Sequence, residues 1–302
     1  MIARLLAPLV LLITAPVAAQ QSLPRPQPVQ AVPLAEDVHP ALWQVSDADT
    51  TIYLFGTIHL LPKGLDWFKG PLAQAFASAD ELVTEIPDID PETTRAVLMK
   101  RGILPPGQSL RAQMTLRERA RFERTLAGFG LPADAFDRFK PWYAAVVLTT
   151  LPLQRKGYSL ENGVEADLAA RNQALGRPRL GLETLDYQLS LFDGFPAQVQ
   201  RRYLFEVIDA LPDIDKDVGE MVEAWRTGDA AKLAELMNAE EDDPVMIEAL
   251  LTNRNKAWAK WIKARLARPG TAFVAVGAGH LGGKGSVQEQ LQALGVKSAR
   301  VQ

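Results

Sequence analysis

The chain has 302 residues, with 33 Lys and Arg against 36 Asp and Glu, and 47% of its residues are hydrophobic. This composition is that of a folded globular protein and excludes global disorder. A net charge of -3 argues against a general nucleic-acid-binding protein, which would carry a basic excess. Because there is no cysteine, a disulfide framework, a zinc finger, an iron–sulfur cluster and a thiolate nucleophile are all excluded.

The first 19 residues are typical of a secretory signal peptide. Arg4 supplies the positive charge, an apolar core follows over 5–13, and small residues up to Ala19 form a cleavage site. A membrane anchor is the alternative, but the apolar run is shorter than the ~20 residues that a span needs. We therefore expect cleavage after Ala19, a periplasmic or secreted protein, and no membrane span after cleavage.

The remaining chain divides into a linker and one domain. Residues 20–40 contain five prolines and several glutamines, which predicts an extended linker, and the globular pattern covers 41–302. Strands are expected at 42–45 and 51–56, as a hairpin, and at 81–86, 179–183, 271–276 and 297–301. Helices are expected from 71, 90 and 115, over 141–151 and 163–175, from 196, and over 244–267 and 286–294. This alternation predicts an α/β fold, in which a central, mostly parallel sheet with an N-terminal hairpin is flanked by many helices, with a large helical insertion between about 90 and 160.

Two of the three histidines occupy matching positions. His59 and His280 each follow a glycine by three residues, in the tetrapeptides GTIH and GAGH, just beyond an apolar strand. In open α/β sheets, ligands bind beyond the carboxyl ends of the strands. We expect the glycine to let the backbone turn sharply, so that the imidazole returns over the sheet edge. A strand-end histidine is often simply hydrogen-bonded, but two such motifs more than 200 residues apart favour a functional role. The third histidine, His39, falls in the linker and is interpreted as an exposed bystander.

Two glutamates follow other strands in the same way. Glu85 ends the strand expected at 81–86, and Glu183 ends the strand expected at 179–183. If the four strands are neighbours, two imidazoles and two carboxylates converge on one edge, and these donors suit Mn, Fe, Co or Zn. Each glutamate also has a structural interpretation, because Glu85 could serve a helix N-terminus and Glu183 could cap the next helix.

The long helix expected over 244–267 carries two polar residues on its apolar stripe. Arg254 and Asn255 stand where the spacing of Leu251 and Trp258 predicts core-facing positions. Polar groups in such positions are costly unless they are hydrogen-bonded. The pair therefore either ties a structural network or reaches the site, where Arg254 could neutralise a carboxylate or an oxyanion.

Together these motifs resemble the TraB/GumN family, which is related to the Tiki metalloproteases and more distantly to the erythromycin-esterase and ChaN-like proteins. The motifs are LWQV at 42–45, YLFGTIH at 53–59, the strand ending in Glu85, GLE at 181–183, Arg254-Asn255 and GAGHL at 277–281. The resemblance implies an α/β fold with both G-x-x-H motifs at one site and, for the Tiki branch, metal-dependent peptide-bond hydrolysis. His59, His280 and Glu85 match the family's motif positions, and Arg254 and Asn255 match its helix.

We therefore expect an exported, metal-dependent hydrolase, a peptidase that acts on a peptide or protein. His59 and His280, with Glu85 or Glu183, would hold a divalent ion (Mn, Co or Zn) that lowers the pKa of bound water and polarises a carbonyl. The glutamate that does not bind the ion would be the general base, and Arg254 would stabilise the oxyanion. Asn255 is placed in the same site. The alternatives are a haem- or metal-binding protein without turnover and a non-catalytic interaction protein of the same family.

Overall fold

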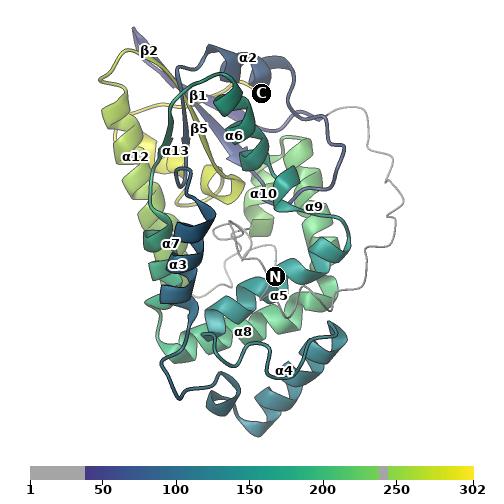
Figure 1. Cartoon of the computed structure of the whole chain (residues 1–302). Helices are drawn as coiled ribbons and strands as arrows, with labels where there is room; N and C mark the ends of the chain where they lie inside the picture. The colour runs from purple at the N-terminus through teal and green to yellow at the C-terminus, as the bar shows by residue number, and fades with distance from the viewer. Residues whose placement is uncertain (1–37, 238–243) are drawn as a thin grey trace.

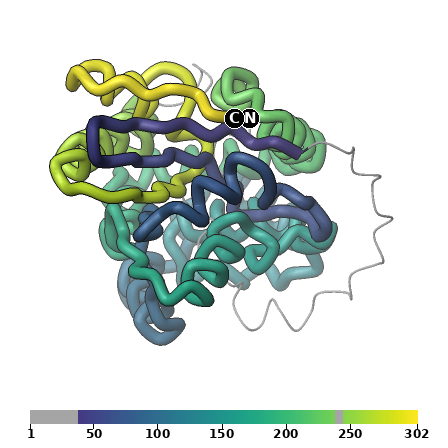
Figure 2. Tube along the Cα trace, turned by 90° about the horizontal axis from the view of Figure 1, so that it is seen from above, coloured from purple at the N-terminus to yellow at the C-terminus, as the bar shows by residue number. Residues whose placement is uncertain are grey.

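The centre of the fold is a six-stranded sheet in the order β4-β3-β5-β2-β1-β6. The computed structural model describes residues 38–237 and 244–302, so the predicted signal segment and most of the predicted linker lie outside the described residues. The strands are β1 (Leu42–Ser46), β2 (Thr50–Thr57), β3 (Glu81–Thr84), β4 (Arg179–Gly181), β5 (Gly270–Gly277) and β6 (Ala299–Arg300). The four strands β2, β3, β4 and β5 run parallel to one another. In contrast, β1 is antiparallel to both β2 and β6. Figure 2 shows the C-terminal segment beside the N-terminal hairpin. This arrangement confirms the predicted α/β fold.

Helices cover both faces of the sheet and form a separate helical part below it (Figure 1). They are α2 (Gly70–Ser78), α3 (Pro91–Gly102), α4 (Leu116–Gly128), α5 (Pro141–Arg155), α6 (Val164–Ala174), α7 (Leu185–Asp193), α8 (Ala197–Ala210), α9 (Ile214–Arg226), α10 (Ala230–Met237), α11 (Pro244–Ile247), α12 (Asn253–Arg265) and α13 (Val287–Ala293). α12 and α13 pack on one face, and α2, α6, α9 and α10 pack on the other. No helix of the described part is long and apolar enough to cross a membrane.

The helical part has its own core, made mainly by α4, α5, α7 and α8. It includes the insertion expected between 90 and 160. The helix starts follow the sequence signals: a proline opens each of α2, α3 and α5, and α4 begins at the capping box formed by Thr115 and Glu118. This part places α7 beside the carboxyl ends of β3 and β4, where Gln188 of α7 contacts Glu85 and Glu183.

The helix predicted over 244–267 is not regular. A π-helical turn, η5 (Glu248–Thr252), separates α11 from α12. A π turn holds one more residue than an α turn, so it rotates the buried side of the helix. Ile247 lies four residues before Leu251, so a regular helix would place it on the same apolar stripe, but it is only partly buried, whereas Met246 and Leu250 are buried. Beyond the π turn the predicted inward positions hold, and Arg254 and Asn255 are 1% and 0% exposed.

Candidate functional site

The four strands that carry the predicted site residues are neighbours in the order β4-β3-β5-β2. His59 and His280 lie just beyond the carboxyl ends of the adjacent parallel strands β2 and β5. Glu85 directly follows β3, and Glu183 follows β4. The sheet order therefore brings the predicted imidazoles and carboxylates to one edge, as the sequence pattern implied.

The glycines of the two G-x-x-H motifs allow close packing rather than an unusual turn, because neither has a positive φ. A Cβ on Gly56 would lie 3.0 Å from the Cβ of Ala278, so the two motifs pack directly on each other. The carbonyl of Gly56 accepts a hydrogen bond from Trp225 Nε1 at 2.8 Å. The backbone N–H of Gly277 donates to Glu85 Oε1 at 2.8 Å. The expected sharp turn is thus replaced by a close approach that excludes a side chain at Gly56.

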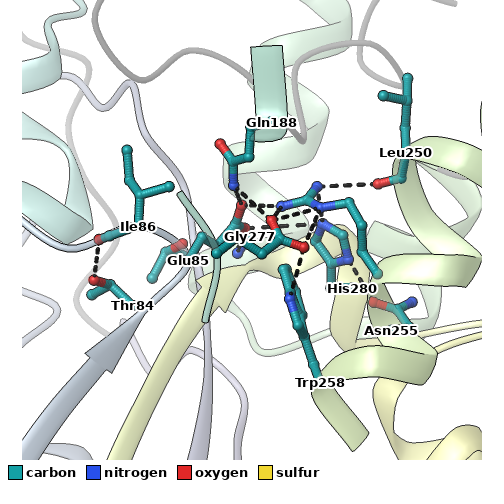
Figure 3. A network of polar contacts seen from close by, with 12 residues as sticks. Thr84, Glu85, Ile86, Gln188, Leu250, Asn255, Trp258, Gly277 and His280 are labelled. Atoms are coloured by element: carbon teal, nitrogen blue, oxygen red, sulfur yellow. Dashed lines mark hydrogen bonds and ion pairs between the residues drawn. The ribbon is translucent and has the colours of Figure 1, made fainter. Parts of the chain in front are cut away.

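Arg254 is buried and contacts several polar groups. Figure 3 labels four of the residues around it, Glu85, Gln188, Leu250 and His280. Arg254 Nη2 is 2.6 Å from Glu85 Oε2 and 2.9 Å from Glu183 Oε2. Its Nε donates to Glu183, and its Nη1 contacts the carbonyl of Leu250 at 3.1 Å and His280 Nε2 at 3.2 Å. Burial alone would lower the pKa of Arg254, but the two carboxylates outweigh it and raise that pKa. The guanidinium is therefore a fixed positive charge.

Two further side chains, Gln188 and Trp258, bind the same carboxylates. Gln188 Nε2 donates to Glu85 Oε2 at 2.9 Å and to Glu183 Oε2 at 3.1 Å. Trp258 Nε1 donates to Glu183 Oε1 at 2.9 Å, and its ring lies 4.7 Å from the guanidinium carbon of Arg254. Each of the four carboxylate oxygens thus accepts at least one hydrogen bond, which offsets the cost of burying them.

His280 is held in one tautomer by Asn255. The amide nitrogen of Asn255 donates to the carbonyl of Gly285 at 2.8 Å, so its Oδ1 faces His280 Nδ1 at 2.6 Å as an acceptor. The proton of the neutral ring is then on Nδ1, and the lone pair is on Nε2. Burial, followed by the electrostatic influence of Arg254 and of His59, lowers the pKa of His280 well below its usual value. His280 is therefore neutral, and His59 is near enough to influence it electrostatically.

His59 pairs with Glu165, a residue that the sequence patterns did not single out. His59 Nδ1 lies 2.8 Å from Glu165 Oε1, which also accepts a hydrogen bond from the Thr57 hydroxyl. Burial would raise the pKa of Glu165, but the charge of His59 and these hydrogen bonds outweigh it and lower that pKa. Glu165 comes from the first turn of α6, which is fixed against the His59 segment because Val164 N–H donates to the carbonyl of Ile58 at 3.1 Å.

The structure thus divides the predicted residues into two groups. Glu85, Glu183, Arg254, Asn255 and His280 form one continuous network, and His59 belongs to a second pair with Glu165. Glu85 and Glu183 bind Arg254 rather than a helix N-terminus, and Asn255 orients His280. Among residues 38–237 and 244–302, no three His, Cys, Asp or Glu side chains are grouped so that they could hold one metal ion.

Comparison with known proteins places the chain in a family. The model of the TraB/PrgY/gumN family matches residues 41–300. An uncharacterized protein of Treponema pallidum is 25% identical over 262 residues, which cover 81% of this chain and 78% of that protein. The uncharacterized protein YbaP of Escherichia coli, like that of Shigella flexneri, is 22% identical over 242 residues, covering 80% of this chain and 87% of YbaP. No solved structure gives a significant match. The matched region spans the whole sheet and both histidine motifs, and the chain belongs to the TraB/PrgY/gumN family.

Proposed function

We propose that this protein is an exported hydrolase that cleaves peptide bonds, with its active site at the carboxyl ends of β2 and β5. One observation carries the proposal: the buried His59–Glu165 pair lies at the same sheet edge as His280 and the Arg254 network. A buried carboxylate–imidazole pair is an arrangement that suits general-base catalysis of acyl transfer to water. The resemblance of the motifs to the Tiki metalloproteases favours a peptide or protein as substrate.

In this proposal His59 is the general base and Glu165 positions it. A carboxylate on Nδ1 keeps the proton there, so that Nε2 is the nitrogen that exchanges protons with the reactants. His59 takes a proton from water as the water oxygen attacks the carbonyl carbon. When the C–N bond breaks, the imidazolium returns that proton to the leaving amine, and the products are a carboxylic acid and an amine. Arg254, which the sequence predicted to stabilise the oxyanion, is bound by Glu85 and Glu183 in the structure, so we assign it no contact with the carbonyl oxygen.

The divalent metal ion expected from the sequence, Mn, Co or Zn, stays a prediction. The described side chains do not fit the predicted ligand set of His59, His280 and Glu85. Both oxygens of Glu85 accept hydrogen bonds, and both ring nitrogens of His280 are in contact with polar partners. For this reason we assign no step of the reaction to a metal ion.

Cleavage of a peptide library by the purified full chain tests the hydrolase proposal. We expect His59→Ala to lower kcat/KM by about 100-fold or more, since this is the usual contribution of a general base. Glu165→Gln should lower kcat more than it changes KM, with partial recovery in Glu165→Asp. His39→Ala is the matched control, because this exposed histidine contacts only the Arg226 carbonyl. Equal cleavage by wild type and His59→Ala would contradict the assignment.

Export is tested separately from activity. If the signal segment is removed after Ala19, the mature protein begins at Gln20. Mass spectrometry of the protein from the periplasm or culture medium of an expressing bacterium should show that N-terminus. Full-length protein confined to the cytoplasm would contradict the localisation but would leave the hydrolase proposal intact.

A further inference from the structure

All three guanidinium nitrogens of Arg254 donate hydrogen bonds within the buried cluster. A guanidinium carries five N–H groups, one on Nε and two on each Nη. The Nε–H goes to Glu183, the two N–H groups on Nη1 go to the Leu250 carbonyl and His280 Nε2, and Nη2 donates to Glu85. Nη2 also lies 2.9 Å from Glu183 Oε2 as an ion pair. The side chain is 0% exposed. Each of the three guanidinium nitrogens of Arg254 is therefore engaged within its own cluster, and the side chain is closed off from solvent.

Three of these acceptors are groups that the sequence pattern assigned to a metal ion. The decisive one is His280, because a neutral imidazole has a single lone pair in the ring plane. Asn255 fixes that lone pair on Nε2, and Nε2 lies 3.2 Å from Arg254 Nη1. A hydrogen bond from the guanidinium and a bond to a metal ion both need this lone pair, so they exclude each other.

The carboxylates lead to the same result. Glu85 and Glu183 would repel each other in this buried position, and Arg254 lies within 2.6 Å of one and 2.9 Å of the other. A guanidinium is planar, stays protonated and binds carboxylates through paired N–H groups, so it can serve as a permanent counter-ion. Trp258 lies against it, with its ring 4.7 Å from the guanidinium carbon. The position is built for this cation.

The backbone adds an independent sign that the position is specific. The Leu250 carbonyl that accepts an N–H from Arg254 lies within the π-helical turn η5. π turns are rare, and they occur frequently at functional sites. Here the turn separates α11 from α12 and places the carbonyl oxygen of Leu250 within hydrogen-bond distance of Arg254 Nη1. The helix geometry as well as the side chains thus accommodates Arg254.

We propose that Arg254 is the resident cation of this site and that it takes the place between His280, Glu85 and Glu183 which a divalent metal ion would otherwise occupy. In the native protein His280 is therefore an acceptor for arginine and not a metal ligand. Removing the guanidinium leaves one imidazole and two carboxylates around the same position, and these donors bind Mn, Co and Zn. The site is thus a latent metal site that the arginine closes.

Cobalt binding tests this proposal without any substrate, so the result stands whether or not the chain is a hydrolase. The probe is Co²⁺ alone, followed by equilibrium dialysis and by the visible absorption of the bound ion. We expect Arg254→Gln to bind one more equivalent of Co²⁺ than wild type and to gain thermal stability when Co²⁺ is added. The double variant Arg254→Gln/His280→Ala should bind it at least about tenfold more weakly, because a ligand is lost.

Arg265→Gln is the matched control. Arg265 is a second buried arginine of α12, 5% exposed, with its Nε 2.5 Å from a single carboxylate, Glu81. One carboxylate without an imidazole does not make a metal site, so this variant should bind no more Co²⁺ than wild type.

A measurement that needs no Arg254 variant covers the case in which Arg254→Gln does not fold. Wild type and His280→Ala should bind the same amount of Co²⁺, because His280 is not a ligand while Arg254 is present. Wild-type binding of one equivalent that is lost in His280→Ala would overturn the proposal. A folded Arg254→Gln variant that binds no additional Co²⁺ would overturn it as well.

Discussion

Gly163→Ala should destabilise the protein strongly, because there is no room for a methyl group between α6 and the His59 segment. Gly163 has a φ of -64°, which alanine adopts easily, so the effect is steric only. An added Cβ would lie 2.1 Å from the carbonyl oxygen and 2.9 Å from the carbonyl carbon of His59. The obstructing atoms are backbone, and the hydrogen bond from Val164 N–H to the Ile58 carbonyl holds both segments in place.

The expected magnitude follows from the size of this overlap. Overpacking typically costs about 1–3 kcal/mol, and this site belongs at the upper end because the backbone must shift by roughly an ångström. A loss of about 3 kcal/mol corresponds to a fall in Tm of roughly 6–12 °C for a domain of this size. Urea and thermal denaturation, followed by circular dichroism, measure both values. In any molecules that fold, Glu165 should be displaced from His59.

Gly219→Ala provides the opposite expectation in the same assay. Gly219 is exposed in α9, and no atom lies within 4 Å of an added Cβ. Alanine in a helix interior is favoured over glycine by up to about 1 kcal/mol, so this variant should be slightly more stable than wild type. If Gly163→Ala were as stable as wild type, the close contact between α6 and the His59 segment would be wrong.

Three further variants each test one polar contact, two buried at the site and one on the surface. Trp225→Phe removes the hydrogen bond to the Gly56 carbonyl and should cost about 1–3 kcal/mol in urea denaturation, because the carbonyl stays buried without a donor. Arg254→Met, in buffer with a chelator, should cost about 3–5 kcal/mol, because two buried carboxylates lose their counter-ion. Asp186→Asn tests a surface contact: hydrogen bonds from Arg101 hold the pKa of Asp186 at about 2, below its usual 3.8. A lowered pKa stabilises the fold above pH 4 and loses that effect as the pH falls through 2. At pH 7, Asp186→Asn should therefore lower the free energy of unfolding by less than about 1 kcal/mol, because the contact is exposed. The difference between the two proteins, measured by thermal denaturation, should vanish near pH 2.

The sequence predicted the edge of the sheet well because the signals there are local. An apolar run followed by G-x-x-H marks the end of a strand, and parallel strands end on the same side. His59 and His280 could therefore be placed together without knowledge of any contact. The predicted convergence of the four site residues required only that their four strands be neighbours. A parallel sheet with helical connections favours that arrangement.

The partners of these residues could not be predicted, because nothing local distinguishes them. Glu165 stands in the first turn of a helix, where an acidic residue is common in any case because of the helix dipole. Gln188 is a buried residue of α7. It is 103 residues away from Glu85 in the sequence and 5 residues away from Glu183. The π turn was missed for a similar reason, since a regular 3.6-residue period fits the stripe nearly as well. For Glu165 and for the contact of Gln188 with Glu85, the partner is more than 100 residues away in the sequence.

The pattern of satisfied and unsatisfied atoms shows where a ligand can act. Arg254 and the carboxylates around it have no donor or oxygen without a partner, so a substrate gains little there unless it breaks an existing bond. Two other buried oxygens at this edge have no hydrogen-bond partner: Oε2 of Glu165 and Oε1 of Gln188. A buried acceptor without a donor costs about 1–3 kcal/mol, and a ligand that supplies the donor recovers that energy. Donors such as the N–H groups of a peptide, or a water molecule, would recover it. The Arg254 network therefore fixes the geometry of the site, whereas Glu165 and Gln188 each keep one buried acceptor oxygen without a donor.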